Sequence, residues 1–203
     1  MGFKSATTTF FALAVLAASP AAAGDFYYGA GLGYTHAKSG TGSFGTEASN
    51  ADLSMLGLTL GYRVDRAKVF FAGELDGDVN LGGKFHDDVS GNTCTSGANG
   101  PYYCSHDSTL RLRGIVGSSL KNGYEIFGSL GVIQVRGKSA VNSFVQDSVR
   151  STGVTVGIGA QRKMSNYGVG RLELIYDKAN SSNNPGGYEP KYQAVTLKAS
   201  WLF

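Results

Sequence analysis

The chain ends in the segment Tyr192 to Phe203, which reads YQAVTLKASWLF. From Val195 to Phe203 every second side chain is apolar, and Thr196, Lys198 and Ser200 alternate with these apolar residues. Alternation with a period of two residues is typical of a β-strand that has one apolar face and one polar face. The apolar face carries two aromatic side chains, Trp201 and Phe203, at the end of the strand.

Seven more segments alternate in the same way. They span residues 26–36, 53–64, 69–79, 109–120, 124–135, 151–161 and 169–177. Each has about the 9 to 11 residues that a tilted membrane strand needs. The connections after the second, fourth and sixth segments are short, and the longest of the others covers about residues 80–108. The pattern predicts an all-β fold, namely an eight-stranded antiparallel up-and-down transmembrane β-barrel with short periplasmic turns and long extracellular loops.

Two features favour a membrane barrel over a water-soluble, lipocalin-like barrel, in which the apolar faces would point inward around a ligand pocket. The polar faces are rich in glycine, which suits the narrow interior of an eight-stranded barrel better than a solvated surface. Aromatic side chains lie at the ends of the apolar faces, as in interfacial girdles. They are Phe26, Tyr62, Tyr124, Trp201 and Phe203 at one rim, and Tyr34 and Tyr176 at the other.

The first 23 residues have the features of a secretory signal peptide. Lys4 precedes an apolar run over residues 10–18, Pro20 follows the run, and Ala21 to Ala23 offers a small-residue cleavage site. The run is shorter than the roughly 20 apolar residues of a membrane-spanning helix. The alternative is a buried N-terminal helix. We expect residues 1–23 to be cleaved and residues 24–203 to form one barrel domain.

Composition and cysteine content narrow the functional classes. The formal net charge is +3 and no basic run stands out, so we expect no nucleic-acid partner. The two cysteines are Cys94 and Cys104, and an exported chain meets an oxidising compartment, so we expect them to form a disulfide. A metal site is the alternative, but only His86 and His106 stand near the cysteines as further ligands.

The signal peptide, the eight alternating segments and the terminal Phe203 together resemble the small eight-stranded outer-membrane proteins of Gram-negative bacteria. These include OmpA-like and OmpX-like barrels and the opacity-type or porin-family surface proteins. The resemblance implies a location in the outer membrane, contact with its lipid and lipopolysaccharide, and a closing strand whose Phe203 is read by the assembly machinery. It also implies a monomer without a cofactor, and a role as a surface antigen, adhesin or membrane-stabilising protein.

Ionisable residues on the polar faces are expected to line the lumen. The set is Arg63, Glu74, Asp76, Asp78, Arg111, Arg113, Glu125, Arg171, Glu173 and Lys198. Five are basic and five are acidic, and charges inside a barrel need to be paired or wetted. The first interpretation is a structural network that fills the lumen. The alternative is a path for protons or ions, which would make the protein a narrow porin-like channel.

The outer end of the chain's fourth segment offers two further hypotheses. His106 and Ser108 have the spacing found in a lipid A deacylase of this architecture, and alternation places both on the lipid-facing side. The deacylase motif continues with Asn where this chain has Thr109, and no acidic partner is placed, so we expect no enzymatic activity and no catalytic or metal site. The cysteine loop carries Tyr102 and Tyr103, which are candidates for recognition of an extracellular ligand; the loop could equally be a protective staple.

Cations near the outer rim complete the candidate residues. They are Arg136, Lys138, Arg150, Lys178 and Lys191. They could contact lipopolysaccharide phosphates, or they could be ordinary loop charges that favour solubility. Because loops carry recognition on a generic scaffold, we expect a structural or surface-recognition role in the Gram-negative envelope.

Overall fold

The computed structural model describes residues 24–40, 48–87, 101–141, 145–165, 168–181 and 191–203. The predicted signal peptide, residues 1–23, lies outside the described residues. Eight long strands make the wall: β1 (Asp25–Gly40), β2 (Ala48–Arg66), β3 (Val69–Gly82), β5 (Pro101–Ser119), β6 (Tyr124–Val141), β7 (Val145–Ser165), β8 (Gly168–Ser181) and β9 (Lys191–Leu202). A two-residue strand, β4 (His86–Asp87), pairs with the start of β2. The 3-10 turn η1 (Lys121–Gly123) joins β5 to β6.

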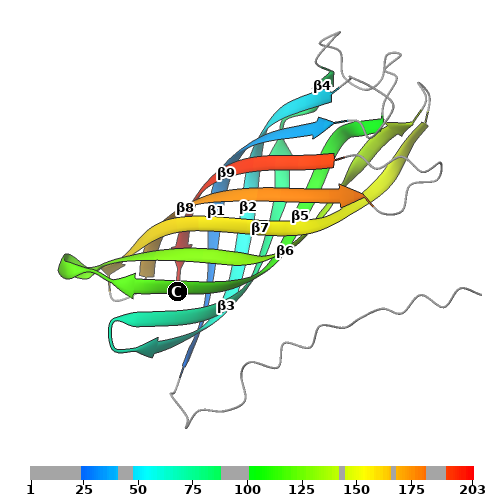
Figure 1. Cartoon of the computed structure of the whole chain (residues 1–203). Coiled ribbons are helices and arrows are strands. Elements are labelled where there is room, and N and C mark those ends of the chain that lie inside the picture. The colour runs from blue at the N-terminus through cyan, green and yellow to red at the C-terminus, as the bar shows by residue number, and fades with distance from the viewer. Residues whose placement is uncertain (1–23, 41–47, 88–100, 142–144, 166–167, 182–190) are drawn as a thin grey trace, which may run out of the picture.

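The long strands form a closed antiparallel barrel, which confirms the predicted fold class (Figure 1). Each strand pairs with the next long strand along the chain, and β1 closes the circle by pairing with both β2 and β9. Two backbone hydrogen bonds extend the closure to the last residue, because Phe203 and Tyr28 each donate an N–H to the other's carbonyl, at 2.8 and 3.2 Å. Their rings also stack, with centroids 5.7 Å apart.

The register of the pairs sets the width of the barrel. We followed directly paired residues from strand to strand once around the barrel. The path starts at Gly29 on β1, passes through Thr59, Asp76 and Arg111, and returns to β1 at Ser39, ten residues further along. Eight strands with this stagger are tilted by about 40° to the barrel axis and leave an interior that side chains can fill. The fold therefore places inward side chains within reach of one another across the lumen.

Alternation places the apolar side chains outside and the polar ones inside. Leu58 and Ile158 are 67% and 66% exposed, whereas Glu74 and Lys198 are 1% and 2% exposed. A water-soluble barrel would show the reverse, so the lipocalin-like alternative is wrong. The outward apolar band, with the aromatic residues Phe26 and Tyr34 exposed toward its two rims, is the surface that meets lipid.

The strands extend further at the outer end than the sequence pattern predicts. β2 starts at Ala48 instead of residue 53, β5 at Pro101 instead of 109, and β6 and β7 leave only residues 142–144 between them. The wall therefore continues beyond the lipid-facing band, at the end where β4 lies in Figure 1. No helix in the described ranges is long and apolar enough to cross a bilayer.

Candidate functional site

The centre of the lumen is a layer of buried ion pairs around Arg111. Its guanidinium donates from Nε and Nη2 to Asp177, with Nη2 to Oδ2 at 2.6 Å, and from Nη1 to Asp76 at 3.0 Å and to Asp78. Lys198 approaches from β9 and donates to Asp76 at 2.5 Å and Asp78 at 2.7 Å. All five side chains are at most 2% exposed. The layer links β3, β5, β8 and β9 through the interior.

A second layer lies on the periplasmic side of the first. Arg113 joins Glu173 at 2.7 Å to Glu74 at 2.8 Å. Glu74 also accepts hydrogen bonds from Arg171 and, at 2.5 Å, from the Tyr27 hydroxyl. Since Glu74 lies on β3 and Arg171 on β8, this pair spans the full width of the barrel.

The periplasmic end is closed by a third group of side chains. Arg63 donates to both oxygens of Glu125, each at 2.7 Å, and Gln161 donates to the same carboxylate at 2.7 Å. The Arg63 guanidinium lies 3.9 Å from the centre of the Phe70 ring, which packs with Phe127 in a small buried cluster.

All ten predicted lumen residues point inward, and the structure joins them into these three groups. One member was missed. Asp177 lies on the same polar face of β8 as Glu173, so alternation places it in the lumen. The predicted set of lumen charges does not include it. With Asp177 the inward-facing side chains of the network hold six carboxylates against five cations, so the five-to-five balance is wrong; the exposed Asp65 also binds Arg63, at 2.7 Å. Neutral groups that donate hydrogen bonds to these carboxylates, among them Tyr27, Thr59, Ser129 and Gln161, were also missed.

Glycine on the inward face makes room for the network. A Cβ atom at Gly57 would overlap the Asp78 carboxylate and the Lys198 ammonium group, and one at Gly157 would stand 2.7 Å from the Glu173 carboxylate. The glycine-rich polar faces are therefore a steric requirement of a narrow, filled lumen.

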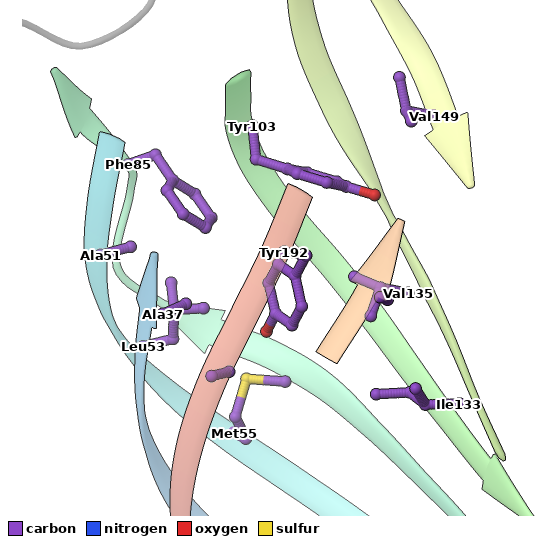
Figure 2. Close-up of a cluster of buried hydrophobic side chains, with 12 residues drawn as sticks. Ala37, Ala51, Leu53, Met55, Phe85, Tyr103, Ile133, Val135, Val149 and Tyr192 are labelled. Atoms are coloured by element: carbon purple, nitrogen blue, oxygen red, sulfur yellow. The ribbon is translucent and has the colours of Figure 1, made fainter. Parts of the chain in front are cut away.

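On the extracellular side of the charged layers, a cluster of buried apolar side chains fills the lumen (Figure 2). We call this cluster the apolar plug; alternation alone did not predict it. Its members are Ala37, Ala51, Leu53, Met55, Phe85, Tyr103, Ile133, Val135, Val149, Ala179, Tyr192 and Ala194. The ring of Tyr103 lies 6.1 Å from that of Phe85 and 5.6 Å from that of Tyr192. The signal in the sequence was a reversal of contrast at the outer strand ends, for example over residues 51–55, where the inward positions Ala51, Leu53 and Met55 are apolar and the outward positions Asp52 and Ser54 are polar.

The structure places His106 inside the barrel, so its predicted lipid-facing position is wrong. The register of β5 against β6 shifts between His106 and Ser108, and this bulge turns His106 inward while Ser108 stays on the outward side with Leu110. The His106 Nε2 atom is 2.9 Å from the Thr109 hydroxyl. Burial lowers the pKa of His106, which lies beyond the lipid-facing segment of β5, to about 4, and the charge of Arg111 acts in the same direction. The two side chains therefore do not form a nucleophile–base pair.

The predicted recognition loop is in part a strand. Tyr103 belongs to β5, its side chain is fully buried, and its hydroxyl is 2.5 Å from that of Ser151, so its predicted place on an exposed loop tip is wrong. Tyr102 is also in β5, with its side chain outside the described part. Cys104 is disulfide-bonded, and Cys94 lies outside the described residues, so the pairing of the two stays a prediction.

The remaining candidates lie at the two ends. Phe203 is 56% exposed beside Tyr28, and its role in assembly stays a prediction. The outer-rim cations all lie in strands and are exposed. Within the described ranges, no three His, Cys, Asp or Glu side chains are grouped to hold a metal ion.

The sequence matches the family described as outer membrane protein beta-barrel domain over residues 8–203. The chain belongs to this family. Its location is therefore the outer membrane, as the sequence predicted, and the resemblance to small outer-membrane barrels is confirmed. No curated protein matches the sequence.

Solved barrels of the same kind are structurally similar at low sequence identity. Ail of Yersinia pestis is 14% identical, with 88% of this chain and 99% of that chain covered and a TM-score of 0.47. The Neisserial surface protein A is 11% identical, with 87% and 97% covered and a TM-score of 0.47. The N-terminal barrel domain of Pseudomonas aeruginosa OprF is 14% identical, with 83% and 96% covered and a TM-score of 0.38.

Proposed function

We propose that this family member is a closed, non-conducting and non-enzymatic barrel with a structural and surface-recognition role in the envelope. The barrel anchors an extension of its own wall above the membrane, and the outward surface of that extension and its loops are the interaction surface. The observation that carries the proposal is the double closure of the lumen, by the charged layers around Arg111 and by the apolar plug around Tyr192.

A narrow porin-like channel is the second candidate, and the charged lumen is the observation that favours it. Conduction needs a continuous file of water past the charges. The hydrogen bonds of Arg111 and Lys198 to three shared or neighbouring carboxylates occupy the centre of that route. The apolar plug then adds a stretch lined by apolar side chains and by neutral hydroxyl groups such as those of Tyr103 and Ser151, which offers an ion no charged partner. A lipid A-modifying activity has less support, because His106 and Ser108 lie on opposite faces of the sheet.

Single-channel recording of the refolded mature protein in a planar bilayer tests the proposal. We expect no discrete, salt-dependent steps, while a shift in gel mobility between unheated and heated samples shows that the barrel has folded. Steps in the wild type whose ion selectivity changes in Arg111→Gln and Glu74→Gln would establish the channel instead. Arg66→Gln is the control, because Arg66 is exposed at the end of β2 and outside the lumen.

A further inference from the structure

Two arginines face each other directly on the outer wall of the barrel. Arg136 on β6 is the direct cross-strand partner of Arg150 on β7, and both side chains are exposed on the outward face. Like charges placed directly opposite each other destabilise a sheet. In the described part of the chain, neither arginine takes part in an ion pair. An anion held between the two guanidinium groups would relieve this repulsion.

Further cations extend this site along the wall. Lys138 follows Arg136 on the same face of β6, and Lys178 and Lys38 flank Gln193 in one row of the sheet. We call the full set the basic arc. It consists of Lys38, Arg136, Lys138, Arg150, Lys178 and Lys191. The arc covers the neighbouring strands β6, β7, β8, β9 and β1.

Few acidic side chains among the described residues lie close to the basic arc. The carboxylates of β8, Glu173 and Asp177, point inward and are buried. The exposed carboxylates Asp52 and Asp107 belong to β2 and β5, the strands on either side of the arc, and Asp107 lies in the β5 bulge next to Arg136. Among the side chains that the structure describes, the outer ends of the five arc strands carry outward-facing cations and no outward-facing carboxylate, which gives this side of the barrel a positive potential.

The basic arc lies just above the lipid-facing band. Lys178 comes two residues after Tyr176, and Lys38 and Arg136 come four residues after Tyr34 and Val132. A strand that rises about 3.3 Å per residue and is tilted by about 40° gains roughly 2.5 Å of height per residue. The cations therefore stand about 5 to 10 Å above the apolar band, which is the level of the lipid head groups in the outer leaflet.

We infer that the basic arc binds the phosphate groups of lipopolysaccharide in the surrounding leaflet, with Arg136 and Arg150 as the principal phosphate site. Guanidinium groups bind phosphate through paired hydrogen bonds, and a phosphate between the two arginines turns their repulsion into attraction. The position on the side of the wall, below the outer strand ends, favours a lipid of the same membrane over a soluble polyanion. The inference is independent of whether the lumen conducts.

The inference is tested by comparing the melting temperature of Arg150→Gln with that of the wild type in vesicles without and with lipid A. Arg150→Gln removes the repulsion from Arg136, so in zwitterionic vesicles at low salt its melting temperature is expected to equal or exceed that of the wild type. In vesicles that contain lipid A the order reverses, because the wild type gains stability from the lipid and the variant loses most of this gain. Lys163→Gln is the matched control, since Lys163 is an exposed cation at the periplasmic end of β7. An equal response of Arg150→Gln and Lys163→Gln to lipid A would overturn the inference.

Titration with fluorescent lipid A gives the second measurement. Loss of two cations in Arg136→Gln/Arg150→Gln is expected to weaken binding about 30-fold at low salt, and dephosphorylated lipid A is expected to bind the wild type as weakly as the variant binds lipid A. Equal affinity of the wild type for both lipids would exclude phosphate recognition. Binding of a soluble heparin fragment without binding of lipid A would assign the arc to an extracellular polyanion and refute its assignment to the leaflet.

Discussion

Arg111 on β5 holds Asp177 on β8 through hydrogen bonds from two guanidinium nitrogens, although 66 residues separate the two in the chain. β6 and β7 lie between the two strands in the sheet, so the pair braces the wall from inside. Both side chains are almost completely buried, where an ion without a partner costs several kcal/mol.

Replacement of Arg111 is expected to be more damaging than replacement of Asp177. Arg111→Met leaves Asp76, Asp78 and Asp177 with Lys198 alone and should lower the free energy of unfolding by about 3–5 kcal/mol. Asp177→Asn leaves Arg111 bound to two carboxylates and removes the surplus negative charge, so its cost should be clearly smaller. Urea unfolding of the barrel in lipid vesicles measures both. Equal losses of unfolding free energy in the two variants would contradict the expectation that Asp177 supplies surplus negative charge.

Gly57→Ala should destabilise the barrel by steric overlap. The new methyl group would displace the Asp78 carboxylate or the Lys198 ammonium group, and overpacking of this kind costs about 1–3 kcal/mol. Gly73→Ala is the matched control, because no atom stands within 4 Å of a Cβ at that position. The midpoint of urea unfolding is expected to fall for the Gly57 variant alone; a similar fall for both would point to strand backbone effects.

Stability should decrease in acid because of His106. Its pKa is lowered in the folded protein to about 4, so the unfolded chain binds the proton more readily between about pH 6.5 and 4. The stability present at neutral pH is therefore lost as the pH falls through this interval, by about 3 kcal/mol when complete. His106→Gln should flatten this part of the pH profile of unfolding. An unchanged profile in the variant would assign the acid sensitivity to other groups.

Phe203 is expected to act in assembly beyond its contact with Tyr28. Phe203→Ser should reduce the amount of barrel inserted in the outer membrane of cells, whereas the refolded variant should lose only the stability of one stacked pair, about 1 kcal/mol. Tyr28→Leu removes the same stacking contact and leaves the terminal residue intact. Equal insertion defects in the two variants would show that the contact, and no assembly signal, is responsible.

Period-two alternation was sufficient to predict the barrel and the inward position of residues such as Glu74 and Lys198, because lipid and a narrow lumen impose opposite demands on the two faces of a strand. Alternation was not sufficient in the parts of the strands that lie beyond the lipid. Beyond the lipid band the contrast reverses, because Leu53 and Met55 point inward while the polar Asp52 and Ser54 point outward. At His106 a bulge shifts the phase of β5, and alternation alone does not reveal an inserted residue. Tyr103 was assigned to a loop, yet it lies in the strand extension.

The ten-residue stagger gives the buried ion pairs a further consequence. If one strand slipped by two residues, every apolar side chain would still face the lipid. Contact with lipid alone therefore does not favour the correct register over the slipped one. If β8 were the slipped strand, Asp177 would move two residues along the wall and lose its hydrogen bonds from Arg111. The ion pairs of the lumen therefore favour the correct register, because only that register places each buried cation next to its carboxylates.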